Sequence, residues 1–187
     1  MEYVDPIKNV EQINAMKIIL QKQSYRDLLL FSLGINTGIS LSHLLFLQVE
    51  DVWTGEEMKE FLILTKEKSG EIQEFYLNHQ VEKVLKNYLA FSDLRQSDYL
   101  FKSKKNNQPI TRQQAYRIIN QAAKLAGITG RIGTHTLRKT FGYHAYRKGI
   151  AVSIIMDILH HQSPTETLRY IGIDKNEKHL IRVDVNL

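Results

Sequence analysis

The sequence contains no cysteine, and its 187 residues include only 3 prolines, 10 glycines and 1 tryptophan. The absence of cysteine excludes a disulfide framework, a thiolate metal site and a cysteine nucleophile, and it fits a reducing cytoplasm. Proline and glycine are too scarce to form a flexible linker, and we find no internal repeat or low-complexity tract. We therefore expect residues 1–187 to form a single domain with one buried core.

Long apolar runs are also missing, since none approaches the roughly 20 residues that span a bilayer. The N-terminus, Met1 to Asp5, lacks the basic and then apolar order of a signal peptide. We expect a cytoplasmic protein without a membrane partner. The chain has 25 Lys and Arg against 20 Asp and Glu, a net charge of +5. This modest excess favours a polyanionic partner such as a nucleic acid but does not establish one.

Most of the hydrophobic pattern is helical. Asn9 is expected to cap a first helix, and Ser24 with Asp27 to cap a second one that contains an apolar run at 28–31. A last helix is expected to begin at Ser163, with proline at its first position, and to contain Tyr170 about two turns later. Further helices are predicted at 42–47, 81–89, 111–125, 134–146 and 152–159.

Strand-like runs occur at 49–53, 61–64 and 73–77, and the last two predict a hairpin. The polar turn between them would place Lys66 close to its tip. Residues 180–187 also alternate between apolar and polar side chains, which predicts a strand in a possible docking tail at 174–187. The fold class that we expect is α+β, mostly helical, with a small antiparallel sheet.

Three motifs stand in order near the C-terminus: His135-Thr136-Leu137-Arg138, His160-His161-Gln162-Ser163, and Thr167 to Ile171 around Tyr170. They resemble the signature of the tyrosine recombinase or phage integrase family. That signature reads His-x-x-Arg, then Gly-His-x-Ser, then Tyr nine residues after the second His, and Tyr170 stands nine residues after His161. The resemblance extends from Asp5 to about Ile173.

The chemistry of these residues can be argued without the family. Cutting a phosphodiester through a covalent intermediate needs a nucleophile, cations beside the phosphate oxygens and an acid for the departing oxygen. A tyrosine phenol leaves more easily than an alkoxide, so a link through Tyr170 can be reversed. His135 and Arg138 share one helix face, and Arg138 presents a planar fork to phosphate. His161 can donate a hydrogen bond or move a proton near neutral pH.

The resemblance assigns the catalytic roles. It makes Tyr170 the nucleophile, places Arg138, His135 and His161 on the phosphate, and makes Lys66 the general acid. It implies DNA contacts from Lys66 and Arg138, and no metal or small-molecule cofactor. The partners that it implies are double-stranded DNA and other recombinase protomers, which form a multimer on DNA in the nucleoid. The implied function is site-specific recombination or integration through a 3′-phosphotyrosyl intermediate, in a phage or another mobile element.

One position departs from the family pattern Thr-Gly-x-Arg-x-Ser-Glu, because Ser40 occupies the place of the arginine. An arginine in a phosphoryl-transfer site contributes roughly 10³- to 10⁵-fold in rate. We favour a family member with impaired catalysis, since the other motif residues are present. Two alternatives remain: another arginine, such as Arg131, reaches the DNA phosphate instead, or the change is peculiar to this gene copy.

Other readings also stay open. The chain could be a catalytically silent DNA-binding module that occupies recombination sites or assembles with a complete recombinase. A type IB topoisomerase would share the same chemistry. The resemblance begins almost at the N-terminus, so we expect a short form without the separate N-terminal domain that grips DNA. His160 replaces the family's glycine, and because neighbouring helical residues face apart, we expect His160 to be structural and His161 functional.

Overall fold

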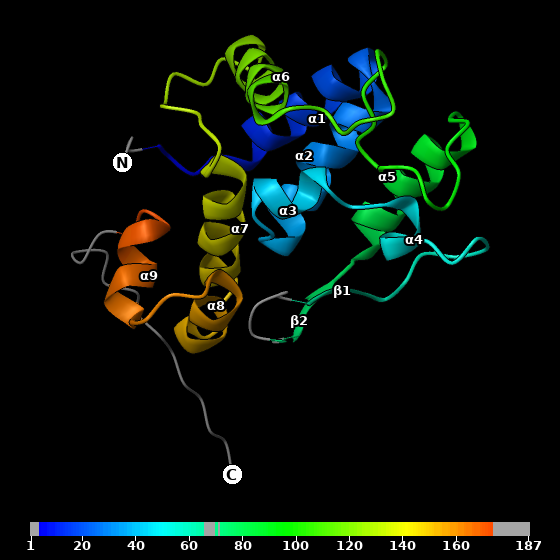
Figure 1. Cartoon of the computed structure of the whole chain (residues 1–187). Coiled ribbons are helices and arrows are strands. Elements are labelled where there is room, and N and C mark those ends of the chain that lie inside the picture. The colour runs from blue at the N-terminus through cyan, green and yellow to red at the C-terminus, as the bar shows by residue number, and fades with distance from the viewer. Residues whose placement is uncertain (1–3, 66–69, 71, 174–187) are drawn as a thin grey trace.

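The computed structural model describes residues 4–65, 70 and 72–173, and within these it contains nine helices and two strands (Figure 1). The expected α+β class, mostly helical with a small antiparallel sheet, is confirmed. The elements are, in chain order, α1 (Val10–Gln23), α2 (Tyr25–Thr37), α3 (Leu41–Leu45), α4 (Val49–Val52), β1 (Phe61–Thr65), β2 (Ile72–Tyr76), α5 (His79–Ala90), α6 (Arg112–Leu125), α7 (Thr136–Arg147), α8 (Val152–Leu159) and α9 (Pro164–Tyr170).

The sheet is the predicted hairpin, in which β1 pairs antiparallel with β2 and Phe61 lies opposite Tyr76. The strand that we expected at 49–53 is wrong, because α4 occupies this position. The Asp51 carboxylate accepts the backbone N–H of Gln48 at 2.7 Å and closes a capping box. This local cap stabilises a helical turn although valine favours strands.

Helix α2 forms the centre of the fold and packs against α1, α5 and α7. Its apolar run includes Leu30 and Phe31, which are fully buried, as expected for a helix that is apolar nearly all round. The expected side-chain cap at Ser24 is wrong, since the Ser24 hydroxyl makes no capping bond. Ser24 also ends α1 in an extended conformation, and its carbonyl oxygen accepts the N–H of Leu28 instead.

Helix α7 lies so close to α2 that glycine is required at two contacts. A Cβ atom on Gly34 would come within 2.6 Å of Leu137, and one on Gly38 within 2.5 Å of Phe141. Gly38 also ends α2 with φ +74°, a conformation that glycine adopts without strain. The turn that leads to Ser40 is therefore held directly against α7.

Helices α8 and α9 lie beside another side of α7 (Figure 1). Together with α7 side chains they form a small core around Ile155, Leu159 and Ile171. The N-terminal segment runs along the same helix: the Ile7 N–H donates to Thr140 Oγ1 at 2.9 Å. Thus α7 is contacted by α2, by α8 and by the first described residues of the chain. Side chains from its first turn are held between these neighbours.

No helix among residues 4–65, 70 and 72–173 is long and apolar enough to cross a membrane. The same described residues contain no group of three or more His, Asp or Glu side chains that could hold a metal ion.

Candidate active site

The hydroxyl of Tyr170 lies 3.2 Å from the Nδ1 atom of His135, and the two rings are perpendicular with centroids 6.2 Å apart. Tyr170 is the last residue of α9, and His135 is the residue that immediately precedes α7. These segments meet because α8 and α9 fold back onto α7, with the buried Ile171 beside Gly142. Two of the three sequence motifs are therefore in direct contact.

The third motif contributes His161, whose ring packs edge-on against the Tyr170 ring with centroids 4.7 Å apart. His161 follows α8, and its Nδ1 atom lies 3.0 Å from the hydroxyl of Thr167. The preceding residue, His160, adopts the left-handed conformation with φ 52° and ends α8. His160 therefore makes the turn that places His161 beside Tyr170.

Arg138 lies in the first turn of α7, half-buried, and its Nη2 atom donates to the carbonyl oxygen of Ile158 at 3.2 Å. Its Nε atom is buried and has no hydrogen-bond partner among the described residues. The positive charge of Arg138 acts on His135, His161 and Tyr170. The guanidinium is thus within electrostatic range of all three rings and retains an unused donor.

Partial burial shifts the pKa values of the three rings toward their neutral forms. It lowers the pKa of His135 and of His161 below the ordinary value of 6.5, and the charge of Arg138 lowers both pKa values further. Burial also raises the pKa of the Tyr170 phenol, while Arg138 opposes this effect. At neutral pH the site therefore combines two neutral imidazoles and a neutral phenol with a fixed cation.

The sequence reasoning missed two residues of this site. Lys139 places its ammonium group 5.1 Å from the centroid of the Tyr170 ring and donates to the carbonyl oxygen of Val4 at 2.8 Å. Thr167 is fully buried under His161. Lys139 directly follows Arg138, and Thr167 lies one helical turn before Tyr170, but no pattern in the sequence distinguishes either from an ordinary helix residue.

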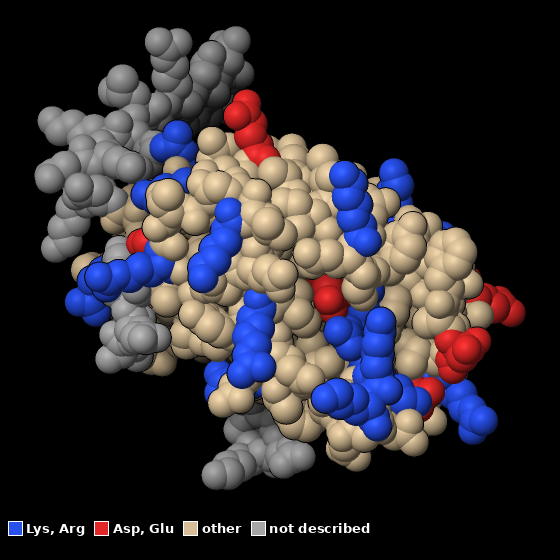
Figure 2. Space-filling model, turned by 90° about the horizontal axis from the view of Figure 1, so that it is seen from above, with Lys and Arg blue, Asp and Glu red and all other residues tan. Residues whose placement is uncertain are grey.

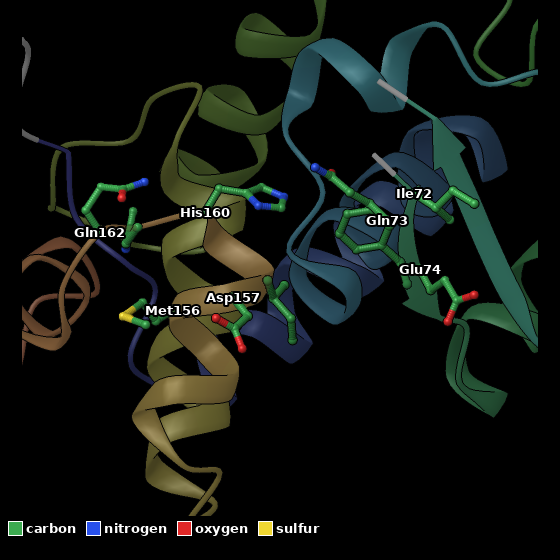
Figure 3. A pocket seen from close by; sticks show the side chains of 10 residues that line it. Ile72, Gln73, Glu74, Met156, Asp157, His160 and Gln162 are labelled. Carbon is green, nitrogen blue, oxygen red and sulfur yellow. The ribbon is translucent and has the colours of Figure 1, made fainter. Parts of the chain in front are cut away.

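A pocket of about 550 Å³ borders the site between β2 and the end of α8 (Figure 3). His161 forms part of its wall, and Gln73 and His160 point toward one another across it. Gln73 is 8% exposed, and its buried amide nitrogen has no hydrogen-bond partner among the described residues. The strand β2 therefore faces the same region as the histidine turn.

Comparison with known proteins identifies the family. The sequence model described as "Phage integrase family" matches residues 6–177. The chain belongs to this family. It is 40% identical to the probable integrase/recombinase YoeC of Bacillus subtilis over 94% of this chain and 93% of YoeC. It is also 31% identical to the tyrosine recombinase XerC of Thermodesulfovibrio yellowstonii, over 96% of this chain and 58% of that protein.

Solved structures of recombinases show the same fold. The crystal structure of XerA recombinase superimposes with a TM-score of 0.75 at 23% identity, over 93% of this chain and 61% of that one. The XerH site-specific recombinase in a post-cleavage complex with its difH substrate gives a TM-score of 0.71 at 20% identity, over 89% of this chain and 49% of that one. The chain spans about half the length of such recombinases.

Against the integrase pattern, the arginine position is occupied by Ser40, which caps α3. Its Oγ atom accepts the backbone N–H of His43 at 3.3 Å and lies 3.0 Å from the His43 ring nitrogen Nδ1. The serine hydroxyl is therefore engaged with the local turn. It brings no positive charge to the site.

Lys66, the expected general acid, and the expected tail at 174–187 lie outside the described residues. Arg131, the alternative arginine, is exposed, and its backbone N–H donates to the Asp5 carboxylate at 3.1 Å. Arg112, at the start of α6, is the arginine other than Arg138 whose charge lowers the pKa of His135. Arg112 is therefore a better candidate than Arg131 for an additional cation near the site.

Proposed function

We propose that this chain binds double-stranded DNA and breaks and rejoins its strands through a 3′-phosphotyrosyl intermediate, as a site-specific recombinase or integrase. The observation that carries the proposal is the contact of the Tyr170 hydroxyl with His135 at 3.2 Å, beside the half-buried guanidinium of Arg138. A nucleophile, a proton acceptor and a cation are the groups that such a cleavage needs on one side of the phosphate.

In the proposed reaction the Tyr170 oxygen attacks the phosphorus atom and passes its proton to the neutral His135. Burial raises the pKa of the Tyr170 phenol. The proton is therefore expected to leave as the new P–O bond forms, and not before. Arg138 offers its charge to the non-bridging oxygens. The bond to the 5′ oxygen breaks, and that oxygen takes a proton, for which we propose Lys66 as the donor.

The reverse step uses the same groups. A free 5′ hydroxyl attacks the phosphorus atom of the phosphotyrosyl link and gives its proton back to Lys66. The bond from phosphorus to the Tyr170 oxygen breaks, and His135 returns the other proton to the phenolate. One phosphodiester is replaced by another, so the exchange needs no external energy source. The side chains named here can therefore both cleave and rejoin a strand without a metal ion or a small-molecule cofactor.

The surface charge supports DNA as the partner. Lys and Arg side chains are more widespread than Asp and Glu on the face shown in Figure 2, in keeping with the net charge of +5. We propose that Lys66, Arg138 and Arg131 contribute phosphate contacts. Related folds support a multimer on DNA, because lambda integrase has been crystallised as a dimer on a core site and as a tetramer on a Holliday junction.

We further propose that Ser40 impairs the reaction. A capping hydroxyl cannot neutralise the charge that develops on the phosphate, whereas an arginine in such a site contributes roughly 10³- to 10⁵-fold. The alternative is a silent DNA-binding module that occupies recombination sites or assembles with a complete recombinase. The hydrogen bonds between Ser40 and His43 favour neither alternative, since they concern only the local turn.

A trapping experiment separates the two. A duplex site is first selected by binding from a randomised library and then nicked, so that the cleaved strand diffuses away and a covalent adduct accumulates. We expect a slow adduct with the wild-type chain, a faster one with Ser40→Arg and none with Tyr170→Phe. If the wild-type chain binds the selected duplex and forms no adduct, even where Ser40→Arg forms one, the silent module replaces our proposal.

A further inference from the structure

Thr167 lies directly beneath the ring of His161 and is fully buried. Its Oγ1 atom is 3.0 Å from Nδ1 of His161 and 3.2 Å from the carbonyl oxygen of Ser163. The hydroxyl therefore stands between a ring nitrogen, which either donates or accepts, and an oxygen that only accepts. The hydroxyl hydrogen of Thr167 can therefore point either to Nδ1 of His161 or to the Ser163 carbonyl oxygen.

The two orientations of the Thr167 hydroxyl hydrogen differ in the number of hydrogen bonds that they allow. If the hydroxyl hydrogen pointed to Nδ1, the oxygen atoms of Thr167 and Ser163 would face each other at 3.2 Å without a hydrogen between them. If it points to Ser163, the hydroxyl can accept an N–H from His161, and both contacts become hydrogen bonds. The Ser163 carbonyl oxygen accepts the backbone N–H of Thr167 at 3.1 Å in either arrangement. The second arrangement is favoured because it forms two side-chain hydrogen bonds where the first forms one, and because it avoids the repulsion between the lone pairs of two facing oxygen atoms.

We infer that the Thr167 hydroxyl is a positioning group that holds neutral His161 with its proton on Nδ1, so that Nε2 is the atom that gains and loses a proton. The edge-on contact with the Tyr170 ring, 4.7 Å between centroids, restrains the same imidazole from a second side. Neutral His161 then offers an acceptor at Nε2, and it becomes a donor there only when protonated. The part of this inference that concerns strand cleavage rests on the proposed function.

The tautomer matters because His161 is neutral near pH 7. Burial lowers its pKa, and of the charged neighbours only Glu166 acts to raise it. Groups from every packed element bear on the ring: Arg138 from α7, His160 from the end of α8, and Glu166 and Tyr170 from α9, while Asp157 and Glu74 line the same pocket. In the neutral state the site of the single proton decides whether Nε2 accepts or donates.

Nuclear magnetic resonance tests the tautomer without any activity. Multiple-bond ¹H–¹⁵N correlation spectra of the full chain distinguish the two tautomers, and His161→Gln identifies the signals by their loss. We expect the Nδ1–H form in the wild type and in Thr167→Ser, and a shift toward the Nε2–H form in Thr167→Val. The matched control is Thr165→Val, at an exposed position of the same helix, which we expect to leave the spectrum of His161 unchanged.

An Nε2–H form in the wild type, or an unchanged Nδ1–H form in a folded Thr167→Val, overturns the inference. If Thr167→Val does not fold, the wild-type and Thr167→Ser spectra decide, because loss of the Nδ1–H form in either contradicts it. These results do not depend on cleavage. A chain that forms no covalent adduct but shows the expected tautomers fails the proposed function and keeps the positioning role.

The role in cleavage has its own readout, measured in a Ser40→Arg background where adducts form readily. There we expect Thr167→Val to slow adduct formation about tenfold and to shift the acidic limb of its pH profile, with rescue by Thr167→Ser. Duplex affinity is expected to stay unchanged. A Thr167→Val protein with unaltered rate and pH profile contradicts the role of Thr167 in cleavage.

Discussion

His135 Nδ1 lies 3.2 Å from the Tyr170 hydroxyl, although 35 positions separate the two residues in the chain. The contact joins the start of α7 to the end of α9 and keeps the phenol beside its proposed proton acceptor. Tyr170 is half-buried and His135 is exposed, so the contact lies at the protein surface.

His135→Gln tests this contact. Glutamine retains a hydrogen-bonding group but cannot accept the phenolic proton, so we expect covalent adduct formation to fall by roughly 10²- to 10⁴-fold. Duplex affinity should change little. The rate is measured with the nicked substrate, and His79→Gln, at an exposed position on α5, serves as the control. Equal rates for His135→Gln and wild type would exclude His135 as the proton acceptor.

Ser40→Arg is expected to raise adduct formation by about 10³-fold or more, because it restores a guanidinium to the phosphate site. The substitution also removes the serine cap of α3, which should lower the free energy of unfolding by about 1 kcal/mol. Ser40→Gln removes the same cap and adds a long side chain without charge, so it separates charge from shape. Similar rates in the two variants would show that the charge is not what the wild-type chain lacks.

Arg112 and Arg131 can be distinguished by the pKa of His135. The charge of Arg112 lowers this pKa, so Arg112→Gln should raise it, whereas Arg131→Gln should leave it unchanged. Titration of the His135 ring by nuclear magnetic resonance gives both values. If Arg131→Gln has the larger effect, Arg131 is the nearer cation in solution and our preference for Arg112 is wrong.

Acid should destabilise the fold through His135 and His161. Both pKa values lie below 6.5 in the folded protein, so the unfolded chain binds more protons once the pH falls below that value. The free energy of unfolding should therefore be constant above about pH 7.5, decline as the pH drops through 6.5, and level off below the folded pKa values. Urea unfolding at several pH values measures the decline. His135→Gln and His161→Gln should each make it shallower, and an equally steep decline in both would contradict this origin.

Gly38→Ala should destabilise the protein by about 2–4 kcal/mol, since the new methyl group meets Phe141 and the left-handed backbone is strained. Gly149 also has a positive φ of 87°, but its position is open, with nothing within 4 Å of a Cβ atom. Gly149→Ala should therefore cost only about 1 kcal/mol. Chemical denaturation measures the loss in free energy of unfolding for each variant, and the difference between the two losses is the part due to packing against Phe141. Equal losses would mean that α7 can move away from α2.

Local signals in the chain were sufficient for much of the fold. Most helices follow caps and apolar spacing that act within a few residues, as at Ser163, whose hydroxyl accepts the N–H of Glu166. The His-x-x-Arg motif, the His160 to Ser163 motif and the nine-residue step from His161 to Tyr170 together predicted the family. The predicted strand at 49–53 failed because the cap at Asp51 outweighs the strand preference of its valines. The expected Ser24 cap failed because that residue also terminates α1.

Only the tertiary structure decided how the motifs meet. The distance between His135 and Tyr170 depends on α8 and α9 folding back onto α7, and no pattern within either motif encodes that path. The hydrogen bond between His161 and Thr167 and the position of Lys139 beside the Tyr170 ring are likewise properties of packing. Residue types and short-range spacing specify which groups are available. The burial that sets their pKa values, and the partners that hold their protons, arise only when distant segments share one core.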